Sequence, residues 1–210
     1  SRQRSFVFVH IPKTGGTSLA TALEDRADPL ARLMALEMGK PFAQGVAEAR
    51  KSASACRYYA EHAEAFLADQ PVALDSGSAA VAHAPLGVIL GIMPWNFPLW
   101  QVLRFAAPTL MAGNTVLIKH APNVTGTALA LAGLFDDCGL GEGVYSPLVI
   151  DLEPTAGVIA DDRVAAVSLT GSVRAGRSVA ALAGQAVKKC VLELGGSDAY
   201  VVLDDADIET

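Results

Sequence analysis

Four short apolar runs in this sequence each lead into a residue that could bind a ligand or assist a reaction. In chain order these residues are Asn96 after 88–93, Lys119 after 115–118, Gly171 after 164–169 and Glu193 after 187–192. The amide group of Asn96 could donate a hydrogen bond to an oxyanion that develops on a carbonyl carbon. A partly desolvated Glu193 could act as a general base on water. The ammonium group of Lys119 could reach ribose hydroxyls or a 2′-phosphate.

Taken one at a time, these residues also have structural explanations. Asn96 lies between Pro94 and Pro98, where an asparagine suits a turn. Lys119 and Glu193 suit solvent-exposed strand ends. For each residue alone, the structural and the functional explanation both stay open. The presence of all four residues at strand ends, in this order, favours a functional site.

The elements that would hold these residues alternate between strands and helices. Apolar spacing predicts strands at 79–83, 88–93, 115–119, 148–150, 164–169, 187–192 and 199–203, and helices at 99–111, 125–138, 155–160 and 172–183. Pro108 should kink or end the helix that contains it. Strands separated by helices pair in parallel through right-handed crossovers, so we predict an α/β fold with an open, mostly parallel Rossmann-like sheet. Ligands bind beyond the carboxyl ends of such strands.

Helical periodicity dominates the chain before the sheet. Residues 30–38 have a helical pattern, Gly39 suits a C-terminal cap, and Pro41 suits the first turn of a new helix. Small and apolar residues then recur every three or four positions from Val46 to Leu67, which predicts one long helix.

Composition excludes several classes of protein. The chain has 210 residues, of which 51% are hydrophobic, and its net charge of −6 argues against nucleic acid as a partner. Residues 76–103 carry no charged side chain, but three prolines interrupt them, so we expect a buried strand and a turn rather than a membrane span. Three scattered cysteines indicate no metal site and a reducing, cytoplasmic setting.

The ends of the strands carry motifs that resemble those of the aldehyde dehydrogenase superfamily. They are PWNFP at 94–98, GNTVLIK at 113–119, TGS at 170–172 followed by Gly176, and LELGG at 192–196. The sequence around these motifs looks most like that of the succinate-semialdehyde dehydrogenase branch. This resemblance covers about residues 29–210, which we interpret as an incomplete cofactor-binding domain.

The resemblance implies NAD(P)-dependent oxidation of a small aldehyde, succinate semialdehyde being the candidate, to a carboxylic acid. It assigns Asn96 to the oxyanion and Glu193 to the activation of water. It places the cofactor, NADP or NAD, against Met93, Pro94, Trp95, Lys119, Gly171, Ser172, Leu194 and Gly195. Ser172 would cap the helix that follows. Relatives often carry a glutamate where this chain has Pro122. Because no carboxylate is present here to repel a 2′-phosphate, NADP becomes more plausible.

The same resemblance implies that a nucleophilic cysteine is required. In relatives it lies well downstream of the glutamate that matches Glu193. None of Cys56, Cys138 and Cys190 matches that position. We therefore expect the 210 residues alone to be inactive as a dehydrogenase.

A second resemblance covers only residues 5–24. The segment FVFVHIPKTGGTSL at 6–19 is similar to the 5′-phosphosulfate-binding loop of sulfotransferases, which implies a phosphate held by Lys13, Gly15, Gly16 and Thr17. We predict a strand at 5–11, a turn at 12–18, and a poorly anchored remnant over 1–28. The alternatives to a dehydrogenase portion are thus a sulfotransferase-like nucleotide binder and a non-functional fusion or interaction fragment. An exposed sheet edge would favour a homo-oligomer.

Overall fold

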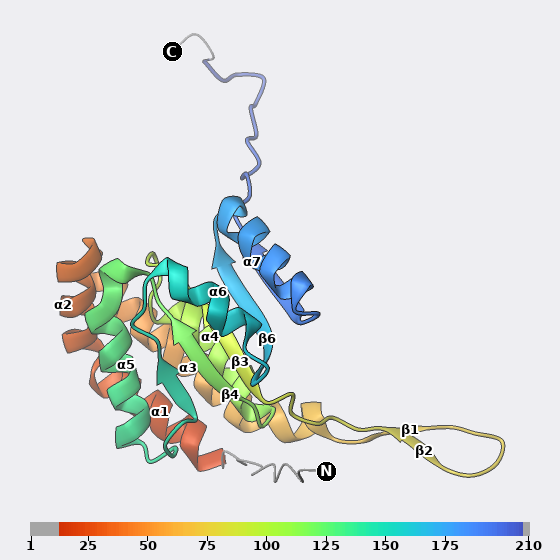
Figure 1. Ribbon diagram of the computed structural model, residues 1–210. Helices are drawn as coiled ribbons and strands as arrows, with labels where there is room; N and C mark the ends of the chain where they lie inside the picture. The colour runs from red at the N-terminus through yellow and green to blue at the C-terminus, as the bar shows by residue number, and fades with distance from the viewer. Residues whose placement is uncertain (1–12, 208–210) are drawn as a thin grey trace.

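Three helices open the part of the chain that the computed structural model describes, residues 13–207. They are α1 (Lys13–Asp25), α2 (Ala27–Met38) and α3 (Phe42–Leu67). Gly39 ends α2 with a φ of +73° and its N–H donates to the carbonyl of Ala35, as expected for a glycine cap. Pro41 lies at the N-cap position of α3. The three helices pack together through buried small and apolar residues, so they form one layer (Figure 1).

A parallel five-stranded sheet follows, in the order β5-β4-β3-β6-β7. Its strands are β3 (Val88–Ile92), β4 (Thr115–Lys119), β5 (Tyr145–Pro147), β6 (Val164–Gly171) and β7 (Lys189–Leu194). The connecting helices are α4 (Trp100–Met111), the short 3-10 helix η1 (Pro122–Val124), α5 (Thr125–Asp137), α6 (Leu152–Ala160) and α7 (Val173–Gln185). All four strand pairings are parallel, which confirms the predicted fold class.

The helices cover the two faces of the sheet unequally. Val116 and Ile118 of β4 pack with α1 to α5, whereas Leu90, Val167 and Leu169 pack with α6 and α7. We call these the α4 face and the α7 face. Among the described residues, only α6 and α7 pack closely against β6 and β7, so the α4 face of these two strands is open, and Val191 is 46% exposed there. That uncovered strip becomes the wall of a cavity described below.

A two-stranded antiparallel hairpin joins α3 to the sheet. It consists of β1 (Gln70–Val72) and β2 (Ala79–Val81), and it projects away from the rest of the chain (Figure 1). All six strand residues are exposed. The prediction included only the second strand, because Pro71 reads as a break rather than as part of an edge strand.

Three predicted elements differ from the structure. Helix α4 continues through Pro108 to Met111, because Pro108 lies in the last turn and its missing N–H costs only one hydrogen bond. The strand predicted at 148–150 lies at Tyr145–Pro147, where Tyr145 is buried. The predicted strand at 199–203 is absent: these residues extend away from the sheet, and Tyr200 is 94% exposed (Figure 1).

The N-terminal expectation is wrong for the described residues. Helix α1 already begins at Lys13, so Gly15 and Gly16 lie in a helix and not in a phosphate-binding turn. A Cβ on Gly16 would lie 2.8 Å from Cε of Met111 and 2.9 Å from Cβ of Ala60, so this glycine permits close helix packing. Leu19 and Leu23 are buried, and the segment is therefore anchored from Gly15 onward. The predicted strand at 5–11 lies outside the described residues.

Within residues 13–207, no helix is both long enough and apolar enough to cross a membrane. In the same part of the chain, no three histidine, cysteine, aspartate or glutamate side chains come together as a metal-binding group.

Candidate functional site

The four predicted residues lie at one edge of the sheet, which the carboxyl ends of the parallel strands form. Ile92 at the end of β3 is opposite Lys119 on one side and opposite Leu169 on the other. One residue further along, Thr170 of β6 is opposite Glu193 of β7. The expectation that the motif residues share one edge is thus met. We call it the carboxyl edge.

The side chains at this edge divide between the two faces of the sheet. Residues that are opposite each other in a parallel pair point to the same face, and Leu169 packs into the cluster of α6 and α7. Lys119 therefore belongs to the α7 face. Glu193 is in register with Thr170, the neighbour of Leu169, and belongs to the α4 face. The sequence alone placed these residues beyond the carboxyl ends of the strands and did not assign them to a face of the sheet.

The loop from β3 to α4 carries Asn96 beyond the carboxyl end of β3. Met93 is buried, and its N–H donates to the carbonyl of Lys119 at 2.9 Å, so the loop leaves the sheet from a fixed point. Trp95 and Phe97 are 49% and 44% exposed, and Asn96 between them is exposed as well. Pro94 is half-buried beside Met93. The amide of Asn96 is thus accessible to a ligand at the carboxyl edge.

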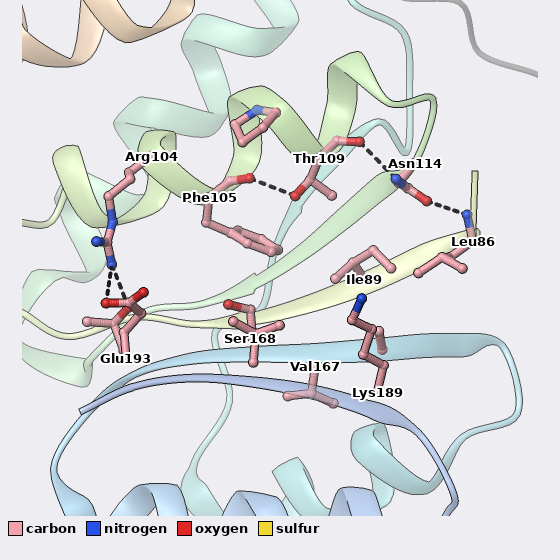
Figure 2. A pocket seen from close by; sticks show the side chains of 14 residues that line it. Leu86, Ile89, Arg104, Phe105, Thr109, Asn114, Val167, Ser168, Lys189 and Glu193 are labelled. Carbon is pink, nitrogen blue, oxygen red and sulfur yellow. Dashed lines mark hydrogen bonds and ion pairs between the residues drawn. The ribbon is translucent and has the colours of Figure 1, made fainter. Parts of the chain in front are cut away.

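A cavity of about 370 Å³ lies on the α4 face, between α4 and strands β3, β6 and β7. At the carboxyl edge of this α4 cavity, Nη2 of Arg104 lies 3.5 Å from Oε2 of Glu193 and 3.5 Å from Oγ1 of Thr170 (Figure 2). The Glu193 side chain is 55% exposed. A carboxylate, a guanidinium and a hydroxyl group therefore meet in a partly enclosed space.

Sequence reasoning missed Arg104. It lies on α4, eight positions after Asn96, and no motif marks it. The only available signal was geometric: α4 begins directly after the Asn96 loop, so a residue about one turn into that helix stays near the same edge.

The far end of the α4 cavity is structural. Asn114 accepts hydrogen bonds from the N–H groups of Leu86 at 2.7 Å and Gly87 at 3.1 Å through Oδ1. Its Nδ2 donates to the carbonyl of Thr109 (Figure 2). This asparagine of the GNTVLIK motif thus holds the entry to β3 against the end of α4.

A second cavity, of about 470 Å³, opens on the other side of the carboxyl edge beside α6. His120, Pro122 and Asp151 line this α6 cavity. Lys119 precedes it and is 4% exposed, and burial lowers the pKa of its ammonium group while Asp151 acts in the opposite direction. A cation and an open pocket are therefore adjacent at the end of β4.

The start of α7 supplies backbone donors on the same side. Ser172 is the N-cap, and its Oγ accepts a hydrogen bond from the N–H of Ala175 at 3.2 Å, as predicted. Leu194 packs over Gly176, where a Cβ would lie 2.5 Å from Cδ2 of the leucine. Gly171 and Gly195 end their strands next to this contact. The glycine at 176 therefore allows β7 and α7 to approach.

None of the three cysteines has the features of a nucleophile. Burial raises the pKa of the Cys56 thiol to about 12 and raises the pKa values of Cys138 and Cys190 as well. A nucleophilic cysteine needs the opposite shift, because the thiolate is the reactive form. We therefore keep the structural interpretation of all three.

An α/β protein with polar residues at the carboxyl edge of a parallel sheet is of the class that binds ligands at that edge. The sequence model described as the aldehyde dehydrogenase family matches residues 17–210, and the chain belongs to that family. The match begins within the segment that resembled a sulfotransferase loop, which agrees with the packing of α1.

Individual relatives are similar over most of this chain. Succinate semialdehyde dehydrogenase Sad of Escherichia coli (strain K12), whose name gives NAD(P)+, is 51% identical over 191 residues, which are 91% of this chain and 41% of that protein. The NADP(+) succinate-semialdehyde dehydrogenase of Deinococcus radiodurans is 51% identical over 91% of this chain and 40% of its own length. The chain thus spans about two fifths of these relatives.

A solved structure gives the same result for the fold. The succinic semialdehyde dehydrogenase of Streptococcus pyogenes, in complex with NADP+, is 38% identical to this chain. It superimposes with a TM-score of 0.91 over 98% of this chain and 45% of that one.

Proposed function

We propose that this chain binds NADP+ or NAD+ at its carboxyl edge and forms the cofactor-binding part of an enzyme that oxidises succinate semialdehyde to succinate. The observation that carries the proposal is the arrangement of the Asn96 loop, Lys119, the start of α7 and Glu193 along one edge. Two cavities flank that edge. The names of the relatives supply the cofactor and the aldehyde.

The two sides of the edge would have different tasks. The α6 cavity, with Lys119 beside it, would take the adenosine end of the cofactor, and the N-terminus of α7 would face its pyrophosphate. The cofactor held there would supply the hydride acceptor for the oxidation of the aldehyde carbon. On the α4 face, the Asn96 amide would donate to the carbonyl oxygen as negative charge develops there. Glu193 would then take a proton from the water that releases the acid.

Arg104 supports a substrate that carries a carboxylate in addition to its aldehyde group. Its guanidinium is 39% exposed in the α4 cavity and is already close to one carboxylate, that of Glu193. The distal carboxylate of succinate semialdehyde could take the place of Glu193 at this cation. Binding of such a substrate would then release Glu193 to act on water.

We further propose that the 210 residues alone bind cofactor without oxidising aldehydes, because none of their cysteines is placed or activated as a nucleophile. The three thiols are unpaired in the described part of the chain, which supports a reducing, cytoplasmic setting.

Calorimetric titration of the purified chain with NADP+ and NAD+ tests the proposal. We expect a dissociation constant below about 1 mM for at least one of them. A folded sample that binds neither at millimolar concentration contradicts the proposed function. Adenosine 3′,5′-bisphosphate serves as the comparison ligand for the discarded N-terminal loop, and we expect no specific binding.

Replacing Pro122 by glutamate should change the selectivity for the cofactor. Pro122 lines the α6 cavity, so a carboxylate there would repel a 2′-phosphate bound beside Lys119. We expect the affinity for NADP+ to fall by about tenfold and the affinity for NAD+ to change little. Asn123→Glu is the matched control, since Asn123 is exposed in the same turn but does not line the cavity. Equal losses for the two cofactors in Pro122→Glu would place the 2′-phosphate elsewhere.

A further inference from the structure

We propose that Glu48 and Lys40 are positioning residues that hold the Asn96 loop in its orientation, an inference that rests on the proposed role of Asn96. Neither residue lies in a motif, and neither touches either cavity at the carboxyl edge. They come from the turn between α2 and α3 and from α3, far from the sheet in sequence. Their contacts nevertheless converge on residues 97–100.

Glu48 caps the helix that follows the loop. Its Oε1 accepts hydrogen bonds from the N–H of Leu99 at 2.9 Å and from the N–H of Trp100 at 3.0 Å. These N–H groups begin α4 and have no partner within the helix. The N-terminal end of a helix also favours a negative charge. One carboxylate oxygen thus fixes where α4 starts and in which direction the preceding loop enters it.

Lys40 adds a second contact at the same end of the loop. Its Nζ forms an ion pair with Oε2 of Glu48 and lies 3.9 Å from the centroid of the Phe97 ring. The side chains of Lys40 and Glu48 are only 4% and 1% exposed. A cation in contact with an aromatic face holds the ring in one orientation. Phe97 is the direct neighbour of Asn96, so this contact restricts the peptide that carries the amide.

Two further contacts hold the loop, one before Asn96 and one after it. Met93 is bonded to Lys119 of β4, and Nε2 of His120 donates to the carbonyl of Pro98 at 3.3 Å. Asn96 itself is exposed and has no regular secondary structure around it. Its orientation therefore depends on the contacts on its two sides, and the Lys40–Glu48 pair, together with His120, supplies those that follow it.

A buried ion pair is not needed for stability alone. Removing two charges from water is costly, and apolar residues of similar size are often equally stabilising at such a position. The pair can, however, do what apolar side chains cannot: accept from two helical N–H groups and orient an aromatic ring. A variant that keeps the volume of the two side chains but removes the acceptor and the cation therefore distinguishes a positioning role from packing.

The chain contains only three asparagines, Asn96, Asn114 and Asn123, so a protein labelled with ¹⁵N on asparagine gives three pairs of side-chain amide peaks. Asn96→Asp assigns its pair by removing it. The variant Lys40→Met/Glu48→Leu takes away both charges and the acceptor while it keeps the volume. We expect the Asn96 peaks to shift by several line widths or to broaden, with the peaks of Asn114 and Asn123 unchanged.

Lys40→Met/Glu48→Gln is the rescue variant. Its side-chain carbonyl can again accept from Leu99 and Trp100, so we expect the Asn96 peaks to return most of the way to their original position. A folded leucine variant whose Asn96 peaks coincide with those of the original chain overturns the proposal. If the leucine variant does not fold, the glutamine variant decides: loss of the cation at Phe97 should still move the Asn96 peaks detectably, and no movement overturns the proposal. The NADP+ titration on the same samples reports on the proposed function separately.

Discussion

Replacement of Lys40 by methionine is expected to lower the free energy of unfolding by about 3–5 kcal/mol. The substitution leaves the Glu48 carboxylate buried, with 1% of its side chain exposed and no counter-ion. Its two hydrogen bonds from Leu99 and Trp100 persist but do not neutralise a charge. In a domain of this size the loss corresponds to a fall in melting temperature of roughly 10 °C. Urea unfolding followed by circular dichroism measures it.

Lys51→Met is the matched control for this prediction. The Nζ of Lys51 also lies 3.9 Å from an aromatic centroid, that of Trp100, but this lysine is exposed. We expect its replacement to cost less than about 1 kcal/mol. Adding Glu48→Gln to Lys40→Met should recover most of the loss, because the isolated charge is then gone. Equal effects of the two lysine variants would mean that burial of the pair does not determine its contribution.

The alternation of strands and helices could be predicted well from the sequence, because each parallel strand is a continuous apolar run. Both ends of the strand at Thr115–Lys119 were predicted correctly, since Gly113 precedes this strand and Pro122 follows it. The tail at 199–203 was misassigned for the same reason that the others succeeded. An apolar run predicts a strand only if a neighbouring strand is available to pair with it, and the described residues provide none there.

The glycines at 15 and 16 show why a short motif fails without its surroundings. A strand, a lysine and two glycines predict an anion-binding turn, but glycine also permits close contact between helices. Here the second outcome is realised, because Leu19 and Leu23 are buried in one cluster with residues of the long helix α3. The helix residues that Gly16 approaches, Ala60 and Met111, lie more than forty residues away from the motif.

Only the residues of the candidate site that follow strands could be predicted from the sequence. Asn96, Lys119 and Glu193 follow apolar runs, and topology brings such positions to one edge. The other charged residues lie in helices, Arg104 in α4 and Glu48 in α3, or between two helices, as Lys40 does. A charged residue at such a position usually faces solvent. Their roles depend on which helix covers which strand. The division of the edge between two faces also required the register, since a shift of one residue exchanges the faces.

His120 makes stability depend on pH in a range where few other side chains titrate. Burial lowers its pKa to about 4, against an ordinary value of 6.5, and the carbonyl of Pro98 and the charge of Glu37 oppose the shift while Lys119 adds to it. The Pro98 carbonyl can only accept, so the proton of the neutral ring lies on Nε2. Nδ1 is buried and has no partner among the described residues, so a second proton there would be an unpaired buried charge.

The sign of the pH effect follows from this shift. Between about pH 6.5 and pH 4 the unfolded chain binds a proton at His120 and the folded chain does not, so the free energy of unfolding falls as the pH falls through that range. The contribution present above pH 6.5 and lost by pH 4 amounts to about 3 kcal/mol. In His120→Gln the curve of stability against pH should be flatter over this interval, as measured by urea unfolding at each pH.

Carboxylates also titrate at the lower end of the interval, so the informative quantity is the difference between the original chain and the variant. His62→Gln is the control, because His62 is an exposed histidine on α3 and should leave the slope unchanged. Parallel curves for the original chain and His120→Gln would mean that the imidazole becomes protonated without cost in the folded state. The contact between His120 and Pro98 would then be too loose to hold the end of the Asn96 loop. The pH profile therefore reports on the same end of the loop that the Lys40–Glu48 pair contacts.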